Sequence, residues 1–493
     1  MLGLRRFVWP FTCASSALLV VCGWLIQAAA FPPPISAEKK LLRVPGEVYS
    51  APTTQRTYSQ LKRKNPLSPI LVEIRLVPLE EAEELSTDAL RAGEPLQIGL
   101  RREVPEPRSK QIPSASLTWE PAKDFGMITS LLVESPRAEA IRVAIALHGI
   151  PANTEIRFYS PRSPDQVFGP YEFSVLSTTK ELPGTDPAPS PLWSPVIQGD
   201  QLAIEIYVPD AVATSQLELS LLQVSHLIRN PMGESPFDQS ASAGGCHKNV
   251  ACSEKWMRTA DSVAMMVFEK PRGTFLCSGQ LINDTDPSTT IYYFLTAAHC
   301  ISKQKVANSA AFYWFYQRSR CKGGSMNSIY QTAGGAKLLY TSGPFLKKTS
   351  PDISFLLLRR PPPDGVSLSG WWARDPTSDY QRKVVGIHHP GGAAKKINKG
   401  EIIGFLRITP RDVFFTPPYT HYVIAWKKGA VEPGSSGSGL WRGKKWPDQY
   451  VMGVLTSGAS GCQNREGPVA YGVLWEAYRK SAKLRRLLGP GSN

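Results

Sequence analysis

The most constraining feature of the sequence is a glycine-rich loop with a serine at its centre, residues 432–440, followed by the apolar run 451–455. Glycine at Gly434 and Gly437 allows backbone turns that a β-carbon would forbid. Such a loop can present the Ser436 hydroxyl beside the N–H groups of Gly434 and Ser436. A nucleophile beside two such donors, which form an oxyanion hole, is what acyl transfer requires. Taken alone, a Gly/Ser cluster is more often an ordinary surface loop.

Two more stretches contain residues that would act with such a serine. An apolar run, residues 294–298, leads into His299, which is followed by Cys300. Asp352 stands at the head of a second apolar run, residues 353–358, where a buried carboxylate could hold an imidazole. Serine, histidine and aspartate form a known catalytic triad, and the order His, Asp, Ser along the chain is one of the few orders in which it occurs. Together the three motifs resemble those of the chymotrypsin-like serine proteases.

Further motifs resemble the bacterial lysyl endopeptidases more closely. Residues 244–246 and 250–252 resemble the start of the mature enzyme, and residues 274–279 resemble a strand of its first barrel. Residues 386–392 and 432–438 resemble two motifs of its second barrel, and residues 192–200 resemble a propeptide segment. The resemblance covers residue 244 to the C-terminus, and more loosely the region before it. It implies an all-β chain, in which a β-sandwich propeptide domain precedes a double six-stranded antiparallel barrel with a C-terminal helix.

Short alternating runs of apolar residues between residues 70 and 228 predict strands without reference to any family. Period-two alternation with Pro and Gly between the runs is typical of an antiparallel β-sandwich. The predicted strands are residues 70–76, 96–101, 127–133, 140–147, 156–159, 171–175, 202–208 and 217–224. This region has no cysteine, and we interpret its His148 and His226 as turn residues rather than catalysts.

Two further sets of runs follow residue 244. The first comprises residues 262–269, 276–282, 290–296, 310–316, 337–341 and 353–358. The second comprises residues 384–389, 401–408, 422–426, 451–455 and 470–474. Two such sets fit two antiparallel barrels, with His299 and Asp352 in the first barrel, Ser436 in the second and the catalytic residues at the seam. Residues 474–488 have the apolar spacing of a helix, with Gly489 as its stop.

The N-terminus has the features of an export signal. Arg5 and Arg6 precede an apolar stretch, residues 11–26, and residues 28–30 are small, as a cleavage site requires. Retention of this stretch as an uncleaved anchor is the alternative. The polar connector 229–245 is typical of a site of proteolytic nicking. We therefore expect a signal peptide (1–30), a propeptide with the β-sandwich (31–243) and a protease domain (244–493), located outside the cell or in the periplasm.

Composition limits the other classes of function. The 493 residues are 42% hydrophobic and 20% charged, which indicates a globular chain with ample core. The net charge of +15 could favour acidic partners, but no basic and aromatic nucleic-acid module is visible. We expect a monomer that binds a polypeptide substrate and its own propeptide, with no membrane span once the signal is removed and no cofactor.

The eight cysteines indicate disulfides. Cys13 and Cys22 lie in the signal, and the other six follow residue 244, an even number in an exported domain. Six cysteines allow 15 pairings, and the sequence alone does not choose among them. The family resemblance implies three pairs: Cys246–Cys462, Cys252–Cys321 and Cys277–Cys300. A zinc site is the alternative, but closely spaced ligand pairs are lacking.

The resemblance also implies the roles of the site residues. Ser436 is the nucleophile, His299 the general base and acid, and Asp352 the group that orients the imidazole. The N–H groups of Gly434 and Ser436 form the oxyanion hole. His388 and His389 are adjacent on a strand and face opposite ways, so we expect structural roles for them and no metal.

Two departures from the family concern specificity. The lysine-selecting Asp is replaced by Val469, and Thr456 stands where those enzymes carry His. Residues Thr456, Ser457 and Gly458 would pair with substrate. We therefore expect a small or apolar primary pocket that prefers uncharged residues, since Glu466, the nearby acid, is typical of a solvated loop.

A third departure concerns activation. Many chymotrypsin-like enzymes carry Asp immediately before the nucleophile, where it pairs with the new N-terminus, but here this residue is Ser435. A propeptide that assists folding or occludes the site fits better than that switch. The alternative function is a non-catalytic binding or adhesion protein built on a protease fold, or one that retains the sandwich as a permanent binding domain.

Overall fold

The computed structural model describes residues 42–44, 47–48, 60–64, 70, 72–79, 95–104, 112–123, 125–172, 191–231, 244–286, 288–345 and 347–489. The predicted export signal, residues 1–30, lies outside these residues, as does most of the connector that precedes Gly244. Within the described ranges, no helix has both the length and the apolar composition needed to cross a bilayer.

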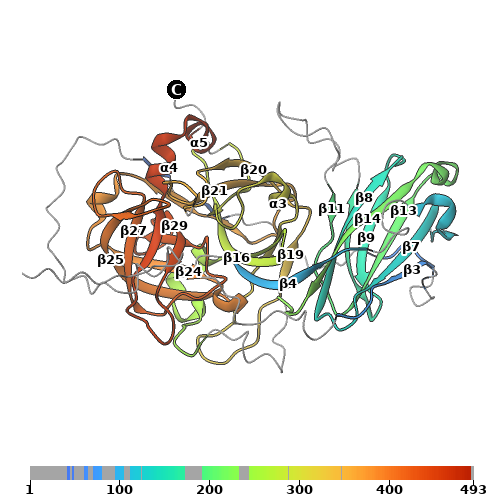
Figure 1. The fold of residues 1–493 in the computed structure, drawn as a ribbon, viewed down its shortest axis with the longest axis horizontal. Helices are drawn as coiled ribbons and strands as arrows, with labels where there is room; N and C mark the ends of the chain where they lie inside the picture. The colour runs from blue at the N-terminus through green and yellow to red at the C-terminus, as the bar shows by residue number, and fades with distance from the viewer. Residues whose placement is uncertain are drawn as a thin grey trace, which may run out of the picture.

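The N-terminal region forms two packed β-sheets, the two layers on the right of Figure 1. The first sheet contains β3 (Val72–Arg75), β6 (Trp119–Pro121), β7 (Met127–Glu134), β9 (Glu155–Ser160), β10 (Ser163–Glu172) and β13 (Gln201–Val208). The second contains β4 (Leu96–Arg102), β5 (Ile112–Pro113), β8 (Ala140–His148), β11 (Leu192–Trp193), β12 (Ile197–Gln198) and β14 (Glu218–Leu227). Apolar side chains of both sheets meet in one buried cluster, so the predicted sandwich is confirmed.

Two details of the sandwich differ from the sequence predictions. β10 begins at Ser163, eight residues earlier than expected, because it pairs only with β9 at the sheet edge, where polar residues and Pro164 are tolerated. The interpretation of His226 as a turn residue is wrong. His226 is buried inside β14, and its Nδ1 lies 2.9 Å from the Ser135 hydroxyl.

The C-terminal region builds two further β-units, on the left of Figure 1. Strands of the first unit are β15 (Val263–Lys270), β16 (Gly273–Ile282), β17 (Tyr293–Ala297), β18 (Ala311–Trp314), β19 (Tyr330–Thr332), β20 (Ala336–Thr341) and β21 (Ile353–Leu358). The second unit contains β24 (Lys383–His388), β25 (Lys396–Ile408), β27 (His421–Lys428), β28 (Gly439–Arg442), β29 (Tyr450–Gly458) and β30 (Val469–Val473). In the second unit β29 pairs with both β28 and β30, which closes a six-stranded antiparallel barrel. The two-barrel prediction is confirmed.

Short elements complete the chain. The remaining described strands are short: β1 (Leu42–Val44), β2 (Glu47–Val48), β22 (Ser367–Leu368), β23 (Gly370–Ala373) and β26 (Val413–Phe414). β1 pairs with β23, and β2 pairs with β22. The α-helices are α2 (Met257–Ala260), α3 (Gln304–Asn308), α4 (Leu474–Lys480) and α5 (Ala482–Leu488). The 3-10 helices are η4 (Ser114–Ser116), η5 (Ala211–Gln216), η6 (Val250–Cys252), η7 (Glu254–Trp256), η8 (Pro376–Asp379) and η9 (Pro390–Gly392).

The single C-terminal helix predicted for residues 474–488 is wrong in one respect. Ser481 interrupts it in an extended conformation, and its hydroxyl accepts the N–H of Leu484 at 3.1 Å. Serine is a favoured N-cap, so the chain ends one helix and begins another at this residue.

One sheet joins the sandwich to the first barrel. β4 pairs with β14 of the sandwich on one side and with β16 of the barrel on the other, and Figure 1 shows it crossing between the two parts. Barrel residues Met265, Val267 and Leu276 belong to the same buried apolar cluster as the sandwich residues. The sandwich is therefore packed against the barrel through both backbone hydrogen bonds and a shared core.

A buried ion pair lies in this interface. Arg142 of β8 and Glu269 of β15 approach to 3.7 Å, and Arg142 also donates to the Ser309 carbonyl at 2.8 Å. Burial lowers the pKa of Arg142 and raises the pKa of Glu269, and the charge of each partner opposes the shift of the other. Each charge is thus held in the interface by the other.

Arg142→Met is expected to destabilise the full chain by about 3–5 kcal/mol, because it leaves the Glu269 carboxylate buried without its cation. Urea unfolding measures this loss. The matched control is Arg162→Met, which removes an exposed cation from its 3.0 Å pair with the half-buried Asp200 and should cost less than about 1 kcal/mol. Equal losses in the free energy of unfolding of the two variants would show that the buried pair stabilises the chain no more than the pair at Arg162.

Candidate active site

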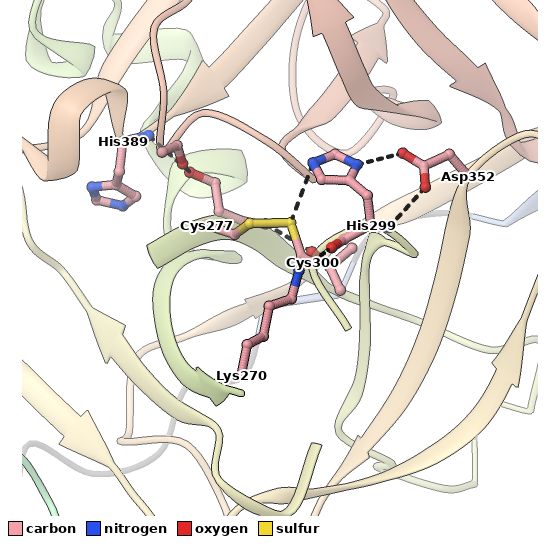
Figure 2. Close-up of a disulfide and its surroundings, with 9 residues drawn as sticks. Lys270, Cys277, His299, Cys300, Asp352 and His389 are labelled. Carbon is pink, nitrogen blue, oxygen red and sulfur yellow. Dashed lines mark hydrogen bonds and ion pairs between the residues drawn. A yellow bond between two sulfur atoms is a disulfide. The ribbon is translucent and has the colours of Figure 1, made fainter. Parts of the chain in front are cut away.

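The His299 and Asp352 side chains meet at the ends of two paired strands. β17 and β21 are antiparallel, and Ala297 lies opposite Ile353, so the residues that follow β17 and precede β21 are neighbours. The Asp352 carboxylate accepts two hydrogen bonds from His299, one from the backbone N–H at 2.8 Å and one from ring Nδ1 at 2.5 Å. Figure 2 shows this carboxylate facing the imidazole. Two bonds from one carboxylate fix both the position and the rotation of the ring.

This contact determines which ring nitrogen is available. A carboxylate can only accept a hydrogen bond, so Nδ1 of His299 carries the hydrogen and Nε2 is the basic atom of the ring. Asp352 is fully buried, and its backbone has φ 55°, in the left-handed region that Asp adopts more readily than most residues. Its carbonyl accepts the Ala298 N–H at 2.8 Å, which ties the acid to the histidine loop a third time.

The Ser436 loop has the turns that its glycines predict. Gly434 and Gly437 both have positive φ, 94° and 81°. A β-carbon at Gly437 would lie 2.2 Å from the Thr296 hydroxyl, so only glycine fits against β17. Between residues 434 and 439, Ser436 is the one residue that is not buried. The loop thus exposes its central hydroxyl while its neighbours are packed.

Ser278 connects the serine loop with the histidine loop. Its N–H donates to the Ser436 carbonyl at 2.8 Å, and its hydroxyl donates to the Gly434 carbonyl at 2.9 Å. The preceding residue, Cys277, is bonded to Cys300, which follows His299, and Figure 2 shows this disulfide beside the imidazole. The serine loop of the second barrel therefore lies against β16 and against the end of β17, the strand that leads into His299.

Within the described residues, several polar groups of the site make no hydrogen bond to one another or to the loop's own backbone. Among the described residues, no hydrogen bond joins His299 to Ser436, and His299 Nε2 lies 3.7 Å from Cys300 Sγ. Likewise, the backbone N–H groups of Gly434 and Ser436 donate to no backbone carbonyl of the described chain. Their two donors are thus not used by the loop's own turn.

Comparison with known proteins agrees with this geometry. Residues 240–472 match the family model "Lysyl endopeptidase, C-terminal domain", and residues 75–228 match "Lysyl endopeptidase N-terminal domain". A lysyl endopeptidase of Pseudomonas aeruginosa is 29% identical over 390 residues, which are 76% of this chain and 77% of the relative. The chain belongs to the chymotrypsin-like serine proteases, near the lysyl endopeptidases. It is a serine endopeptidase.

Two more distant likenesses complete the comparison. A secreted RxLR effector protein of Plasmopara viticola is 26% identical over 214 residues, 42% of this protease and 47% of the effector. A solved thermostable serine protease covers 48% of this chain and 94% of its own, at 15% identity and a TM-score of 0.29.

Three disulfides lie within the described part of the protease. Cys246–Cys462 links the start of the C-terminal region to the loop before β30, Cys252–Cys321 links η6 to the loop between β18 and β19, and Cys277–Cys300 flanks His299. Two clusters of three potential metal ligands occur among the described residues, and each includes one of these disulfides, so their sulfurs are bonded to each other.

The residues expected to contact substrate lie along β29 and β30, next to the serine loop. Gly437 donates its N–H to Leu455 at 2.8 Å, so β29 runs beside Ser436. Thr456 is buried at a register shift, Ser457 is half-buried and Gly458 is exposed. Val469 is fully buried directly opposite Gly458. Glu466 is exposed, as expected.

The sequence did not indicate how the residue before Ser436 is held. The Ser435 hydroxyl lies 2.7 Å from Nδ1 of His388 and accepts the N–H of Glu432 at 3.2 Å. His389, the adjacent residue, instead bonds the Ala393 carbonyl at 2.9 Å and stacks on Tyr316. The two histidines have separate partners, and this agrees with the structural roles expected for them.

Gly472 of the second barrel supports the Asp352 loop. A β-carbon at Gly472 would lie 1.7 Å from the carbonyl oxygen of Pro351, which is the residue before Asp352. The sequence gives no sign of this contact, because 121 residues separate the two positions and only the docking of the two barrels brings them together.

Gly472→Ala is expected to cost about 1–3 kcal/mol or more of stability, because Pro351 must move to make room. It should also lower kcat, since Asp352 moves with Pro351. Thermal unfolding and peptide hydrolysis measure the two effects. Gly461→Ala is the matched control, because a β-carbon there meets nothing within 4 Å. Unchanged kcat in Gly472→Ala would show that the contact does not position Asp352.

Buried histidines predict loss of stability in acid. Burial lowers the pKa of His388 to about 3, with His247 adding to the shift, and burial lowers the pKa of His421 to about 3. In the unfolded chain both titrate near 6.5. Below about pH 6.5 the unfolded state therefore binds more protons, so the stability that these groups contribute is lost as the pH falls toward 3.

The Tm of the inactivated protein should thus fall between pH 6.5 and pH 4, and His388→Gln should reduce the slope of Tm against pH. His148→Gln, at an exposed position, should leave the slope unchanged. An identical slope in all three proteins would contradict the assignment of this acid sensitivity to His388.

Proposed function

We propose that this endopeptidase cleaves peptide bonds with Ser436 as nucleophile, His299 as general base and acid, and Asp352 as the orienting carboxylate. The observation that carries the proposal is the double contact of Asp352 with His299, and the incomplete burial of Ser436 in an otherwise buried loop supports it. The binding-protein alternative is not favoured, because the chain matches the lysyl endopeptidases and retains a residue of the required type at all three positions.

The chemistry follows from the atoms available. Ser436 Oγ attacks the scissile carbonyl carbon, and Nε2 of His299 takes the hydroxyl proton. The N–H groups of Gly434 and Ser436 stabilise the oxyanion, an interaction worth about 3–4 kcal/mol for each donor. His299 then returns the proton to the leaving amine, and water repeats the sequence to release the acyl group from Ser436.

We propose a preference for small uncharged residues at the primary specificity site. At Gly458, a β-carbon would lie 3.0 Å from Val469 and 3.3 Å from Val431, so two buried valines fill the space beside this glycine. Neither offers a charge to a substrate lysine, and burying an unpaired ammonium costs several kcal/mol.

A peptide library tests this preference. Cleavage after Ala or Val should exceed cleavage after Lys by at least about 100-fold. Val469→Asp should raise cleavage after Lys, whereas Val469→Asn, with the same shape and no charge, should not. Strong cleavage after Lys by the unmodified enzyme would refute the proposal.

We also propose that the protein is exported and that residues 31–243 are a removable propeptide. Three disulfides in the region after residue 244 support export. Sequencing the N-terminus of the active secreted form tests both points. A start near Gly244 is expected, whereas a start near residue 31 would mean that the sandwich is a permanent domain.

A further inference from the structure

Gly244, near the end of the connector and the residue at which the described chain resumes, lies against the carboxylate of Glu432. A β-carbon at Gly244 would be 2.5 Å from Cys462 Sγ and 3.2 Å from Glu432 Oε1. The backbone nitrogen of a residue is about 2.5 Å from its β-carbon position, so the Gly244 nitrogen lies within about 6 Å of this carboxylate. Only a glycine fits here without displacing Cys462.

Contacts downstream of Gly244 fix its position. The Gly244 carbonyl accepts the His247 N–H at 3.1 Å, which closes a turn. Cys246 within that turn is bonded to Cys462. Because these contacts involve no residue before Gly244, breaking the chain at residue 243 leaves them in place.

Glu432 is part of the turn that carries the proposed oxyanion hole. Its carbonyl accepts the Ser435 N–H at 3.0 Å, and its N–H donates to the Ser435 hydroxyl at 3.2 Å. Gly434 and Ser436 flank Ser435 in this turn. A group that fixes the Glu432 side chain therefore also restrains the backbone that presents the Gly434 and Ser436 N–H groups.

The charge near Glu432 changes on processing. Its Oε1 lies 3.2 Å from Nε2 of His247, and its side chain is 23% exposed. In the precursor, the Gly244 nitrogen is a neutral amide. Hydrolysis of the bond between Ala243 and Gly244 adds one water and yields a carboxylate on Ala243 and an ammonium on Gly244, with an ordinary pKa near 8.

We propose that Glu432 is the binding site of the new N-terminus, and that its ion pair with the Gly244 ammonium locks the oxyanion turn in its active form. This inference rests on the proposed processing before Gly244. Glu432, three residues before Ser435, thus supplies the carboxylate that many chymotrypsin-like enzymes carry at the position of Ser435. Processing then both removes the propeptide and creates a positive group for the catalytic loop.

Selective carbamylation of the α-amine in the processed enzyme tests the pair without altering the fold. At near-neutral pH the α-amine reacts ahead of lysines because its pKa is lower. Carbamylation should lower kcat about 10-fold or more while KM changes little. In Glu432→Gln, kcat should already be low, and carbamylation should have no further effect.

Two comparisons separate this effect from a structural one. Glu401→Gln, which removes a half-buried acid paired with the exposed Lys427, should keep full activity and full sensitivity to carbamylation. Wild-type kcat should also fall at high pH as the ammonium deprotonates, above its ordinary pKa of about 8 because the Glu432 carboxylate stabilises the charged form, and this limb should be absent in Glu432→Gln. Equal carbamylation effects in wild type and Glu432→Gln would overturn the proposal.

The proposed catalytic function can survive that outcome. An active enzyme that starts at a residue other than Gly244 also overturns the ion pair, while leaving the roles of Ser436, His299 and Asp352 intact. Loss of activity in Ser436→Ala tests those roles separately.

Discussion

Ser436→Ala is expected to lower kcat by about 10⁶-fold, the loss typical of removing a serine nucleophile. No other group can take its place, because Ser435 is bonded to His388 and Ser438 is buried. The substitution should leave Tm nearly unchanged, since Ser436 is only half-buried and its loop is held by backbone contacts of Ser278. The measurement is kcat for peptide hydrolysis, made after processing with an unrelated protease that is then specifically inhibited.

The matched control is Ser438→Ala, two residues away in the same loop. Its buried hydroxyl interacts with the Tyr471 side chain and has no role in the proposed triad, so its removal should change kcat by less than about 10-fold. Hydrolysis by Ser436→Ala at a rate near that of Ser438→Ala would exclude Ser436 as the nucleophile.

Asp352→Asn is expected to lower kcat by about 10⁴-fold while the chain remains folded. The amide keeps the shape of the carboxylate, and its oxygen can still accept the His299 backbone N–H. If the amide NH₂ faces Nδ1, it becomes a donor and leaves the hydrogen on Nε2, the atom that must accept the serine proton. The carboxylate charge that stabilises the imidazolium is lost as well.

The pH profile of kcat distinguishes this effect from misfolding. Activity in Asp352→Asn should recover partly at high pH, whereas a misfolded protein would show no such recovery. Asp286→Asn, at a half-buried acid in the loop between β16 and β17, should retain wild-type activity. A loss of less than about 10-fold in Asp352→Asn would contradict the role of Asp352.

Local patterns predicted most of the fold. Alternating apolar runs gave strands such as β7, β8 and β13 to within one or two residues, because burying one face of a strand requires period-two alternation. Short strands such as β28 were missed, since residues 439–442 follow a glycine-rich loop and carry no such alternation.

Contacts between distant segments were beyond reach of those patterns. The pairing of β4 with β16 looks, in sequence, like two ordinary strands of separate domains. The approach of Gly472 to Pro351 depends on how two barrels dock, and nothing near Gly472 signals it. His226 was misread because its polar ring lies inside a strand, where Ser135 satisfies it.

The candidate site shows the same division. Residue order and flanking strands pointed to His299, Asp352 and Ser436 in advance. The means of support, such as the Ser278 contacts with the serine loop and the His388 contact with Ser435, follow from three-dimensional packing alone.

Mapping the residue that reacts with a fluorophosphonate probe tests the central claim most directly. Such a probe bonds only to a serine activated by its surroundings, and the processed enzyme should carry it on Ser436, with labelling abolished in His299→Ala. A label on another residue, or undiminished labelling of Ser436 without His299, would contradict the account.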